Sequence, residues 1–560
     1  MKKELFGVFG DRSEFCRHRS ETEFDRVLEG DVATVGIRDV GLGIPGRSTA
    51  YAGEEGTCVL WGEIYTPKDA GIDPAEWLLR RYGEVGTDAL SELNGSYLAF
   101  LDRDGEAFVA TDQARTWECY FTDAPGSRVF GTDAAAVADT IQSPETADRP
   151  LLEFLYLGIV LGNRTTLERL HRVPFDGCLH SDSTAELERF VYEPTEFDYV
   201  GELAERLERA LARRARHPGR KGLLLSGGYD SRTILAGMPT LDATFTVGSS
   251  SDAETAVARK VSEQYGVPHH LLSVDDRYLN RGDDAIRYGN GIKESIHIHH
   301  AAYDTQIDVD TIYHGLLWDT FFRGHFLPTD RVNVLGYELP WNRLDPDPNV
   351  AETLVGEKFG FIPTERDLVP DADFAGDGEA LVKDAIDEQL EGQSNRYDSV
   401  YNAIDLVGIG NQPTMPFRYH LADNYLESFI VADRELIDWH LKTPPEHRNS
   451  RTLLEAIRRI DGDVLEHRPP DRPFDSIQLN SVQNFLRKKL PFVSGFTGSW
   501  PDRSRHYDRN HYDQRLFPNR PELHDLPPRL KLRINDITAW LEETADGNAI
   551  LSADYVRPPA

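Results

Sequence analysis

Residues 222–237 read GLLLSGGYDSRTILAG, an apolar run, a glycine-rich turn and a second apolar stretch. The run 222–225 is typical of a buried strand, and residues 232–237 predict a helix. Two glycines at the end of a buried strand let a ligand approach the backbone without meeting a Cβ atom. The N–H groups of such a turn, at the positive end of a helix, suit an anion, most naturally a phosphate. The stretch predicts a phosphate-binding turn; the alternative is a plain connection between strand and helix.

Helix and strand signals alternate on both sides of this turn. Leu203, Leu207 and Leu211 recur at four-residue spacing and predict an amphipathic helix over residues 200–216. The elements predicted beyond the turn are a helix over 232–237, a strand over 243–247, a helix over 253–265 and a strand over 270–273. This βαβαβ order predicts a parallel sheet with crossover helices. Ligands bind beyond the C-terminal ends of strands in such sheets, which is where the turn lies.

The rest of the chain divides into a strand-rich beginning and a helix-rich end. Residues 1 to about 190 show short strand signals with glycine and proline between them. Strands are predicted over 4–9, 57–64, 96–102, 107–111 and 128–130, and helices over 74–82, 379–391 and 452–460. The segment beyond about residue 500 is rich in Pro, Asp and Arg, and its pattern predicts no definite element.

Composition limits the classes of function. The chain has 560 residues, so two or more domains are expected, and 40% of them are hydrophobic, enough to fold. No apolar run of membrane-spanning length and no signal peptide is recognised, which predicts a cytoplasmic protein with no membrane partner. The formal charge of −33 argues against a nucleic-acid surface. Solubility explains this charge better than repulsion of nucleic acid, as in halophilic-type acidic surfaces.

The four cysteines, Cys16, Cys58, Cys119 and Cys178, are widely scattered. No CxxC pair occurs, so neither a zinc site nor a redox motif is indicated. They are expected to be buried free thiols.

Polar residues within the turn indicate a metal as well as a phosphate. Ser226 and Ser231 add hydroxyl donors, whereas the carboxylate of Asp230 repels phosphate. Mg²⁺ resolves this conflict, because it binds a carboxylate together with phosphate oxygens. The turn has no lysine and is not a Walker A loop.

The segment LLLSGGYDSRTIL, residues 223–235, resembles the PP-loop of the asparagine synthetase family, whose pattern is SGG-x-DS. The resemblance implies that the loop holds the pyrophosphate part of ATP and that its Asp helps to bind magnesium. Residues 245–248, FTVG, look like the next strand of that family, whose end borders the adenine and ribose. Residues 313–324, YHGLLWDTFFRG, resemble the family's SGEGADELFGG, with Gly315 and Asp319 on its glycine and its magnesium-binding Asp. Residues 414–438 are similar in order to a later family stretch that ends in PFLD.

By this resemblance, the expected nucleotide-binding residues are Leu225, Ser226, Gly227, Gly228, Asp230, Ser231, Val247, Gly248 and Gly315. The expected ligands of Mg²⁺ are Asp230 and Asp319. For Asp319 the alternative is a helix N-cap or a surface carboxylate.

The N-terminal region is similar to the family's glutamine amidotransferase domain at residues 6–10 (FGVFG), 61–65 (WGEIY) and 93–100 (LNGSYLAF). That domain releases ammonia with a Cys at the mature N-terminus. Here Lys2 and Lys3 stand at the start, and the nearest thiol is Cys16. Trp61 replaces the Asn of the family's oxyanion-hole pair. We expect a degenerate domain without glutaminase activity.

The resemblance implies an α+β and α/β fold, an antiparallel sandwich of the N-terminal-nucleophile hydrolase type followed by a parallel-sheet PP-loop domain with many helices. The expected divisions are residues 1–195 for the amidotransferase-like domain, 196–515 for the ATP-binding domain and 516–560 for a C-terminal tail.

The implied reaction is ATP-dependent amide formation. A carboxylate is activated as an acyl-adenylate with release of pyrophosphate, and ammonia or an amine then attacks it. Arg468 or Arg472 is expected to act on the phosphorus as the catalytic basic residue. Leu316 replaces the Glu of SGEG, so a changed acceptor site is expected. A non-catalytic nucleotide-binding scaffold stays open, whereas the acidic charge and the lack of CxxC disfavour a sulfurtransferase or tRNA-modifying enzyme.

Two further groups were considered as sites. In the segment HIHH, an alternating strand would place His297 and His299 on one face as weak metal ligands, but a solvated or core-edge histidine cluster is favoured. Lys293 and Glu294 are expected to form an exposed ion pair rather than to contact a substrate.

Overall fold

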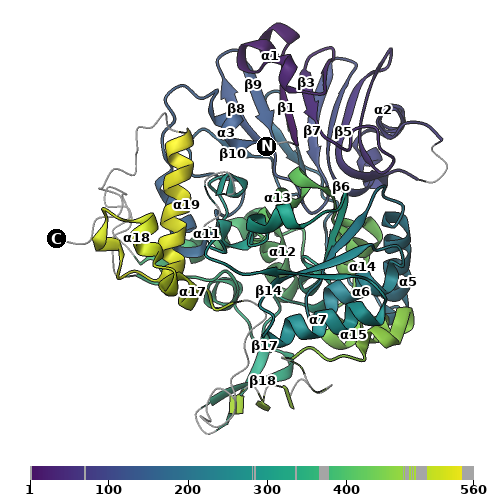
Figure 1. The fold of residues 1–560 in the computed structure, drawn as a ribbon. Coiled ribbons are helices and arrows are strands. Elements are labelled where there is room, and N and C mark those ends of the chain that lie inside the picture. Colours follow the sequence, from purple (N-terminus) through teal and green to yellow (C-terminus); the bar gives the residue numbers. More distant parts are fainter. Residues whose placement is uncertain are drawn as a thin grey trace.

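The protein consists of an N-terminal β-sandwich packed against a parallel-sheet domain that is surrounded by helices (Figure 1). The computed structural model describes residues 3–67, 71–279, 282, 286–334, 337–364, 377–470, 472, 474, 479–480, 482–483, 485–486 and 501–544. Two six-stranded antiparallel sheets form the sandwich, which confirms the predicted architecture.

The first sheet has the order β10 (His171–Arg172), β8 (Tyr120–Ala124), β9 (Ser127–Gly131), β1 (Glu4–Val8), β3 (Thr34–Arg38) and β2 (Arg26–Glu29). The second has the order β12 (Thr184–Glu186), β11 (Gly177–His180), β7 (Glu106–Thr111), β6 (Asn94–Arg103), β5 (Gly56–Tyr65) and β4 (Arg47–Gly53). The five strands predicted in this region are confirmed as β1, β5, β6, β7 and β9, with small differences at their ends.

Both faces of the second sheet are buried, which explains its apolar strands. In β5, Val59 and Trp61 face the core between the two sheets, whereas Cys58 and Leu60 face helix α2 (Pro74–Val85). Since side chains alternate along a strand, a shift of one residue would exchange the two sets, and packing therefore fixes the register. The outer face of the first sheet is covered by α3 (Ala134–Ala138), α4 (Asp148–Leu157) and the C-terminal α19 (Pro528–Thr544).

The second domain is built on a five-stranded parallel sheet. Its order is β15 (His269–Ser273), β14 (Ala243–Gly248), β13 (Lys221–Leu224), β16 (Thr311–His314) and β19 (Leu426–Ser428). The predicted βαβαβ unit is confirmed, with α6 (Tyr229–Gly237) and α7 (Ala253–Gln264) as its crossover helices. Helices α5 (Tyr199–Arg214) and α15 (Ser450–Asp461) pack against each other and against α6. From β13 the chain moves outward through β14 to β15 and then returns to β16 on the other side. This reversal between β13 and β16 creates a crevice at their C-terminal ends, the usual ligand site of such sheets.

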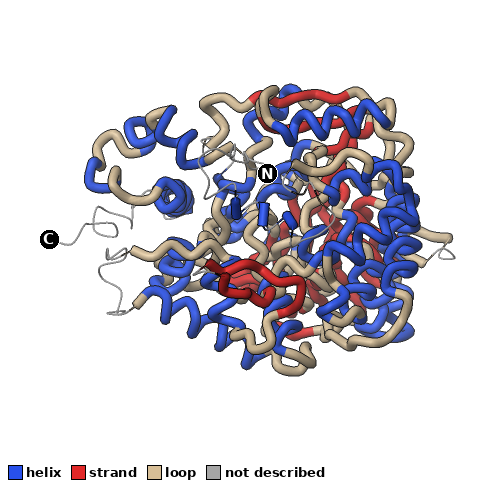
Figure 2. The backbone as a smooth tube through the Cα atoms, turned by 90° about the horizontal axis from the view of Figure 1, so that it is seen from below, coloured by secondary structure: helices blue, strands red, loops and turns tan. Residues whose placement is uncertain are grey.

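Most of the remaining helices lie around this sheet (Figure 2), whereas α1 (Arg12–His18) packs on β1 and β3 of the sandwich. The others are α9 (Trp318–Arg323), α10 (Val350–Thr353), α11 (Gly378–Gly392), α12 (Val400–Gly410), α13 (Pro416–Asn424), α14 (Arg434–Lys442), α17 (Arg503–Arg509) and α18 (Tyr512–Leu516). Short helical turns are Glu21–Glu23, Gly86–Glu92, Arg287–Gly289, Ser295–His297, Ala301–Gln306, Ile430–Ala432, Pro445–His447, Gly462–Leu465 and Pro521–Leu523, with a π-turn at Leu354–Lys358. The hairpin β17 (Thr329–Val334) and β18 (Tyr337–Leu344) projects from the domain.

A buried arginine joins the two domains. From α13, Arg418 donates hydrogen bonds to the Ser96 hydroxyl (2.8 Å) and the Thr116 carbonyl (3.0 Å) of the sandwich. Its other nitrogens bind both carboxylate oxygens of Glu427 in β19, at 3.1 and 2.9 Å. The guanidinium therefore fixes the edge of the parallel sheet to the sandwich.

The expectation of buried thiols in the N-terminal region is confirmed for some of the cysteines and not for all of them. Cys58, Cys119 and Cys178 are buried free thiols as expected, but the expectation is wrong for Cys16, which is exposed on the short helix α1. Lys3 is buried, pairs with Asp39 at 3.0 Å and lies over two tryptophan rings. Lys2 lies outside the described residues.

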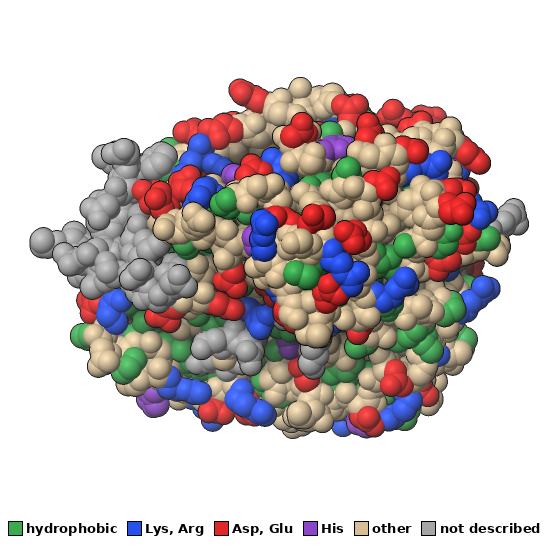
Figure 3. All heavy atoms as spheres, turned by 90° about the horizontal axis from the view of Figure 1, so that it is seen from above, with side chains coloured by type: hydrophobic (Ala, Val, Ile, Leu, Met, Phe, Trp, Pro, Cys, Tyr) green, Lys and Arg blue, Asp and Glu red, His purple; other side chains and the backbone are tan. Residues whose placement is uncertain are grey.

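On the face that Figure 3 shows, acidic side chains are widely spread, with basic ones between them. None of the described helices combines the length and the apolar character needed to cross a bilayer. The expected domain limits at residues 195 and 515 stay predictions; the second falls within α18.

Candidate functional site

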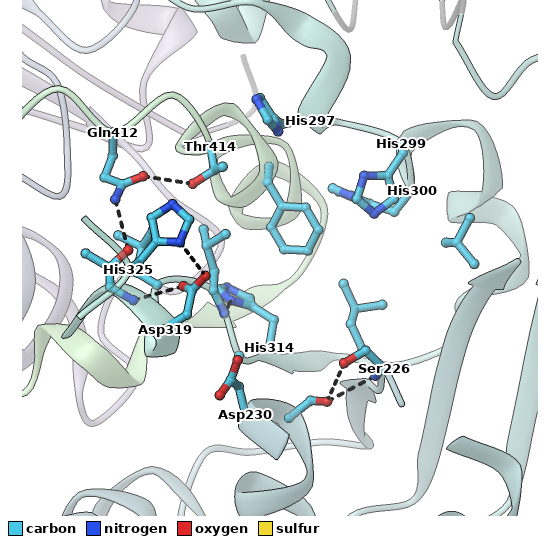
Figure 4. Close-up of a pocket in the computed structure, with 18 of the residues that line it drawn as sticks. Ser226, Asp230, His297, His299, His300, His314, Asp319, His325, Gln412 and Thr414 are labelled. Atoms are coloured by element: carbon cyan, nitrogen blue, oxygen red, sulfur yellow. Dashed lines mark hydrogen bonds and ion pairs between the residues drawn. The ribbon is translucent and has the colours of Figure 1, made fainter. Parts of the chain in front are cut away.

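A cavity of about 390 Å³ opens at the C-terminal ends of β13 and β16 (Figure 4). Seven of the residues predicted to bind nucleotide or metal line it. They are Leu225, Ser226, Asp230, Ser231, Val247, Gly315 and Asp319. Segments that are distant in sequence thus meet where the sheet topology reverses.

The amide N–H groups of the glycine-rich turn donate hydrogen bonds to nearby side chains. The Ser226 N–H donates to the Ser231 hydroxyl (3.0 Å), and the Gly228 N–H donates to the Ser226 hydroxyl (3.2 Å). The Gly227 N–H donates to a carboxylate oxygen of Glu254 at 3.0 Å. Glu254, in the first turn of α7, therefore occupies an amide of the turn that was predicted to bind phosphate. The lining excludes Gly227, Gly228 and the predicted Gly248, which lie beside the cavity.

Asp230 lies in the first turn of α6 and is held by an arginine. The Arg323 guanidinium contacts its two carboxylate oxygens at 3.1 and 3.0 Å. Burial raises the pKa of Asp230, the Arg323 charge opposes this change, and the Asp319 carboxylate raises it further. The two predicted metal ligands are thus close enough to repel each other.

Asp319 lies in the first turn of α9, where one oxygen of its carboxylate accepts a hydrogen bond from the Thr320 N–H at 2.9 Å. Its other oxygen lies 3.3 Å from His325 Nδ1, and its side chain is 43% exposed. The N-cap of α9 is Leu317, which adopts a left-handed φ of 64°, so the N-cap alternative for Asp319 is wrong.

Asp230 and Asp319, which both line the cavity, are the residues that would hold the predicted Mg²⁺ ion. Magnesium is commonly held by one or two carboxylates, with substrate phosphates completing its shell. Among the described residues no group of three or more His, Cys, Asp and Glu is placed to hold a metal alone. This donor set suits a metal that arrives with phosphate oxygens, and binding requires Arg323 to release Asp230.

Gly315 packs directly against the turn. A Cβ atom at this position would lie 2.9 Å from the Ser231 amide nitrogen, so only glycine fits without moving the backbone. The preceding His314 accepts at Nδ1 from the Leu316 N–H (3.3 Å), which leaves its Nε2–H to donate to Glu427 at 2.8 Å. This places the protonated nitrogen toward β19.

Neither of the two arginines predicted to be catalytic, which are both among the described residues, lines the cavity. Arg232 of α6 donates to the His467 carbonyl and so ties residues 467–470 to the turn's helix. The charge of Arg472 lowers the pKa of Asp230, whereas Arg468 is exposed. Arg472 is therefore better placed than Arg468, and the roles of both stay predictions.

The other end of the cavity is lined by histidines. The expectation of an alternating strand is wrong, because Ser295–His297 form a 3₁₀ turn and residues 298–300 are not in a strand. Turns bring His297, His299 and His300 to the cavity instead (Figure 4). His300 Nε2 lies 3.2 Å from His420 Nδ1, which bears out a histidine cluster at the edge of the core.

The expected exposed ion pair between Lys293 and Glu294 is also wrong. Both residues are buried and each binds partners elsewhere. Lys293 pairs with Glu118 of the sandwich at 2.7 Å, and Glu294 pairs with Arg533 of α19 at 2.9 Å. Adjacent residues in sequence thus link this segment to two distant parts of the chain.

Comparison with known proteins identifies a protein family whose model matches part of this chain. Residues 202–296 match the model of the asparagine synthase family. These residues form an asparagine synthase domain. The match runs from the predicted amphipathic helix α5 to the start of the histidine segment, and over these residues it confirms the family suspected from the sequence.

Among solved structures, the glutamine phosphoribosylpyrophosphate amidotransferase from B. subtilis, complexed with ADP and GMP, is 11% identical, with a TM-score of 0.22, over 56% of this chain and 69% of that chain. A structure described as the allosteric regulatory enzyme of purine biosynthesis is 12% identical, with a TM-score of 0.22, over 58% of this chain and 70% of that chain. Likeness at this level carries no argument, and the fold rests on its own topology. No curated protein matches the chain.

Several lining residues of the asparagine synthase domain and its neighbours escaped prediction. Examples are Glu254, His314, His325, Gln412 and Arg503. Gln412 and Arg503 follow the matched residues by more than a hundred positions, so only the tertiary fold brings them near. A signal existed for Arg323, since it lies four residues after Asp319 on the same helix face.

Proposed function

We propose that the chain is an ATP-dependent, AMP-forming carbon–nitrogen ligase. In the proposed reaction a carboxylate oxygen of the substrate attacks the α-phosphorus of ATP and pyrophosphate leaves. Ammonia or an amine then attacks the acyl carbon, forming the amide and releasing AMP. The observation that carries the proposal is the SGGYDS turn, which lines a cavity at the reversal point of a parallel sheet within an asparagine synthase domain.

The residues of the turn have distinct proposed tasks. Ser226, Ser231 and the turn amides hold the pyrophosphate group, and Gly315 leaves room for the backbone to approach it. A magnesium ion held by Asp230 and Asp319 would neutralise negative charge on the phosphate oxygens. Because Glu254 and Arg323 occupy these groups, nucleotide binding must displace both side chains.

The basic residue on the phosphorus is proposed to be Arg472. The Arg472 charge lies close enough to Asp230 to act on its pKa. A guanidinium next to the leaving pyrophosphate would stabilise the negative charge that develops on it. Arg468, on the same segment, is the alternative.

We propose that the nitrogen does not come from glutamine hydrolysed by the sandwich. A cysteine nucleophile needs a lowered pKa. Burial raises the pKa of the Cys58, Cys119 and Cys178 thiols, and partial desolvation together with the Glu21 carboxylate raises the pKa of the exposed Cys16 thiol. Free ammonia or an amine of the substrate is then the nitrogen source.

A second candidate is a nucleotide-binding scaffold without catalysis. Three features favour it: Glu254 on the Gly227 amide, Arg323 on Asp230, and Leu316 in place of the family's Glu. Such a protein would bind ATP without cleaving it.

The two candidates differ in a pyrophosphate-exchange assay with ATP, Mg²⁺ and a panel of carboxylic acids. A ligase exchanges labelled pyrophosphate into ATP only when its acid is present, and Asp230→Ala abolishes that exchange. Asp384→Ala, which removes an exposed carboxylate of α11, is the matched control. ATP binding without exchange for any acid supports the scaffold, and exchange that survives Asp230→Ala contradicts the assigned metal site.

A further inference from the structure

A second cavity lies between the sandwich and α11, and we call it the α11 pocket. It has a volume of about 280 Å³, which suits a small organic molecule. Its lining includes residues 161–164 after α4, Glu186 of β12 and the last two turns of α11 with Gln393. None of the described residues that line it also lines the cavity at the turn, so the two are separate sites.

Gln393, the C-cap residue of α11, brings an unsatisfied amide to this pocket. The residue is only 8% exposed. No hydrogen bond to its side chain is found in the described part of the chain, and its Oε1 atom is buried without a donor. Because an unsatisfied buried acceptor costs free energy, the position favours a ligand that donates a hydrogen bond.

A carboxylate lies at the same end of the α11 pocket. Glu186 accepts two hydrogen bonds from Arg396, at 3.1 and 2.9 Å, and both go to Oε2. The Arg396 N–H donates to the Gln393 carbonyl at 3.0 Å, which makes Glu186 and Gln393 neighbours. Oε1 of Glu186 has no donor among the described residues, and the C-terminal end of α11 adds negative potential. Two open acceptors beside a helix C-terminus suit an ammonium group.

The position of Arg164 along α11 follows from its contacts. Arg164 pairs with the buried Glu153 at 2.7 Å, and Arg149 lies 3.8 Å from the same carboxylate. Arg149 in turn pairs with Glu388 of α11 at 2.9 Å. Since Glu388 precedes Gln393 by five residues, Arg164 lies at a level roughly 7 Å from Gln393 along the helix axis. The arginine therefore marks the other end of the pocket.

This end of the α11 pocket has open donors. Arg164 uses one terminal nitrogen for Glu153, whereas its Nε and its other terminal nitrogen have no partner among the described residues. The side chain is 35% exposed. Arg115 adds a second positive charge here, since it donates to the Asn163 side chain at 2.8 Å, and the nearby Glu388 is paired with Arg149. The free edge of a guanidinium suits a carboxylate.

We propose that the α11 pocket binds a small zwitterionic amino acid. Its ammonium group donates to Gln393 Oε1 and Glu186, and its carboxylate accepts from Arg164. A hydrogen bond of about 2.9 Å at each end leaves the few ångströms between them to the ligand, which is the span of a short amino acid. The site is independent of the proposed ligase reaction, and its ligand bridges the sandwich and α11.

Equilibrium binding tests this proposal with the full-length protein. Alanine, β-alanine and γ-aminobutyrate are titrated calorimetrically beside analogues that lack one charge. Propionate and ethylamine are the analogues of the first two, and butyrate and propylamine are those of the third. We expect at least one amino acid to bind roughly tenfold or more tightly than both of its analogues.

Variants of the pocket locate the binding. Gln393→Leu should weaken the amino acid roughly tenfold or more, whereas Gln393→Glu keeps an acceptor and should keep binding. Arg164→Gln should reduce the affinity to that of the amine analogue. Glu391→Gln, which changes an exposed carboxylate of α11, is the matched control and should bind as the wild type does. Circular dichroism and the urea midpoint of each variant verify that it is folded.

The outcomes separate this site from the catalytic cavity. Loss of binding in Gln393→Leu with unchanged binding in Glu391→Gln supports the proposal. An amino acid that binds Gln393→Leu as tightly as the wild type occupies another site and contradicts it. Analogues with one charge that bind as tightly as the amino acids, or no binding by any amino acid of the panel, also show the proposal to be wrong.

Discussion

Replacement of Arg418 by methionine is predicted to be among the most destabilising single changes in this chain. The substitution leaves the Glu427 carboxylate buried with His314 as its one side-chain partner among the described residues, and it removes the hydrogen bonds to Ser96 and Thr116. Breaking a buried ion pair by removing one partner costs about 3–5 kcal/mol, because an uncompensated charge stays in the interior.

The surroundings of the guanidinium add to this cost. Its central carbon lies 4.3 Å from the ring centre of Trp117 and 4.2 Å from that of Phe429. Such desolvated contacts contribute about 1–2 kcal/mol, of which the apolar methionine side chain recovers a part. We therefore expect the free energy of unfolding to fall by about 4 kcal/mol at pH 7.

The loss should depend on pH. Burial alone would raise the pKa of Glu427, but the Arg418 guanidinium and the His314 imidazole lower it to about 2. A lowered carboxyl pKa stabilises the fold above the unfolded value of about 4.3, and this contribution is lost as the pH falls toward 2. In Arg418→Met the pKa of Glu427 rises, so acidification protonates this carboxylate in the folded state. The difference in the free energy of unfolding between the variant and the wild type should therefore shrink as the pH falls.

Urea unfolding, followed by tryptophan fluorescence at several pH values between 4.5 and 8, measures this effect. Arg418→Met combined with Glu427→Gln should recover much of the loss, since no buried charge is left alone. Arg451→Met removes an exposed arginine of α15 and should cost less than about 1 kcal/mol. A loss below about 1 kcal/mol for Arg418→Met, or a loss that does not change with pH, would refute the reasoning.

Three more predictions concern the site and the buried charges. Gly315→Ala should weaken ATP binding roughly tenfold or more, because its Cβ would lie 2.9 Å from the Ser231 amide nitrogen. The control Gly462→Ala, which has open space around its Cβ, should bind ATP as the wild type does. Equal ATP affinities of Gly315→Ala and wild type in calorimetry would contradict the role of Gly315. Burial lowers the pKa of Lys293 to about 8, so the unfolded state binds more protons between pH 8 and about 10.4, and wild-type stability should rise over that range. Lys293→Met should lack this rise, on the order of 2 kcal/mol in unfolding experiments, and parallel pH profiles contradict it. Asp319→Asn should raise the Mg²⁺ concentration for half-maximal pyrophosphate exchange roughly tenfold, and an unchanged requirement removes Asp319 from the metal site.

Local patterns in the sequence predicted much of the fold. The leucine spacing of α5, the apolar run before Ser226 and the alternation in β5 each depend on neighbouring residues, so their elements formed as expected. The same holds for the turn, since glycines at a strand end leave the backbone open to close approach.

Contacts between distant segments could not be predicted in this way. Lys293 and Glu294 read as an exposed pair because both are charged, yet each found a partner more than a hundred residues away. The histidine segment had the alternation of a strand, but its bonds to α19 hold it in turns. Arg503 carries no motif at all, and only the packing of α17 places it at the cavity.

A crystal structure of the protein with a non-hydrolysable ATP analogue and Mg²⁺ tests the central claim most directly. We predict that the pyrophosphate part contacts the amides of residues 226–228, that Glu254 leaves the Gly227 amide, and that Mg²⁺ replaces Arg323 at Asp230. A nucleotide bound elsewhere, or a turn whose contacts to Glu254 and Arg323 persist beside the bound analogue, would contradict the account.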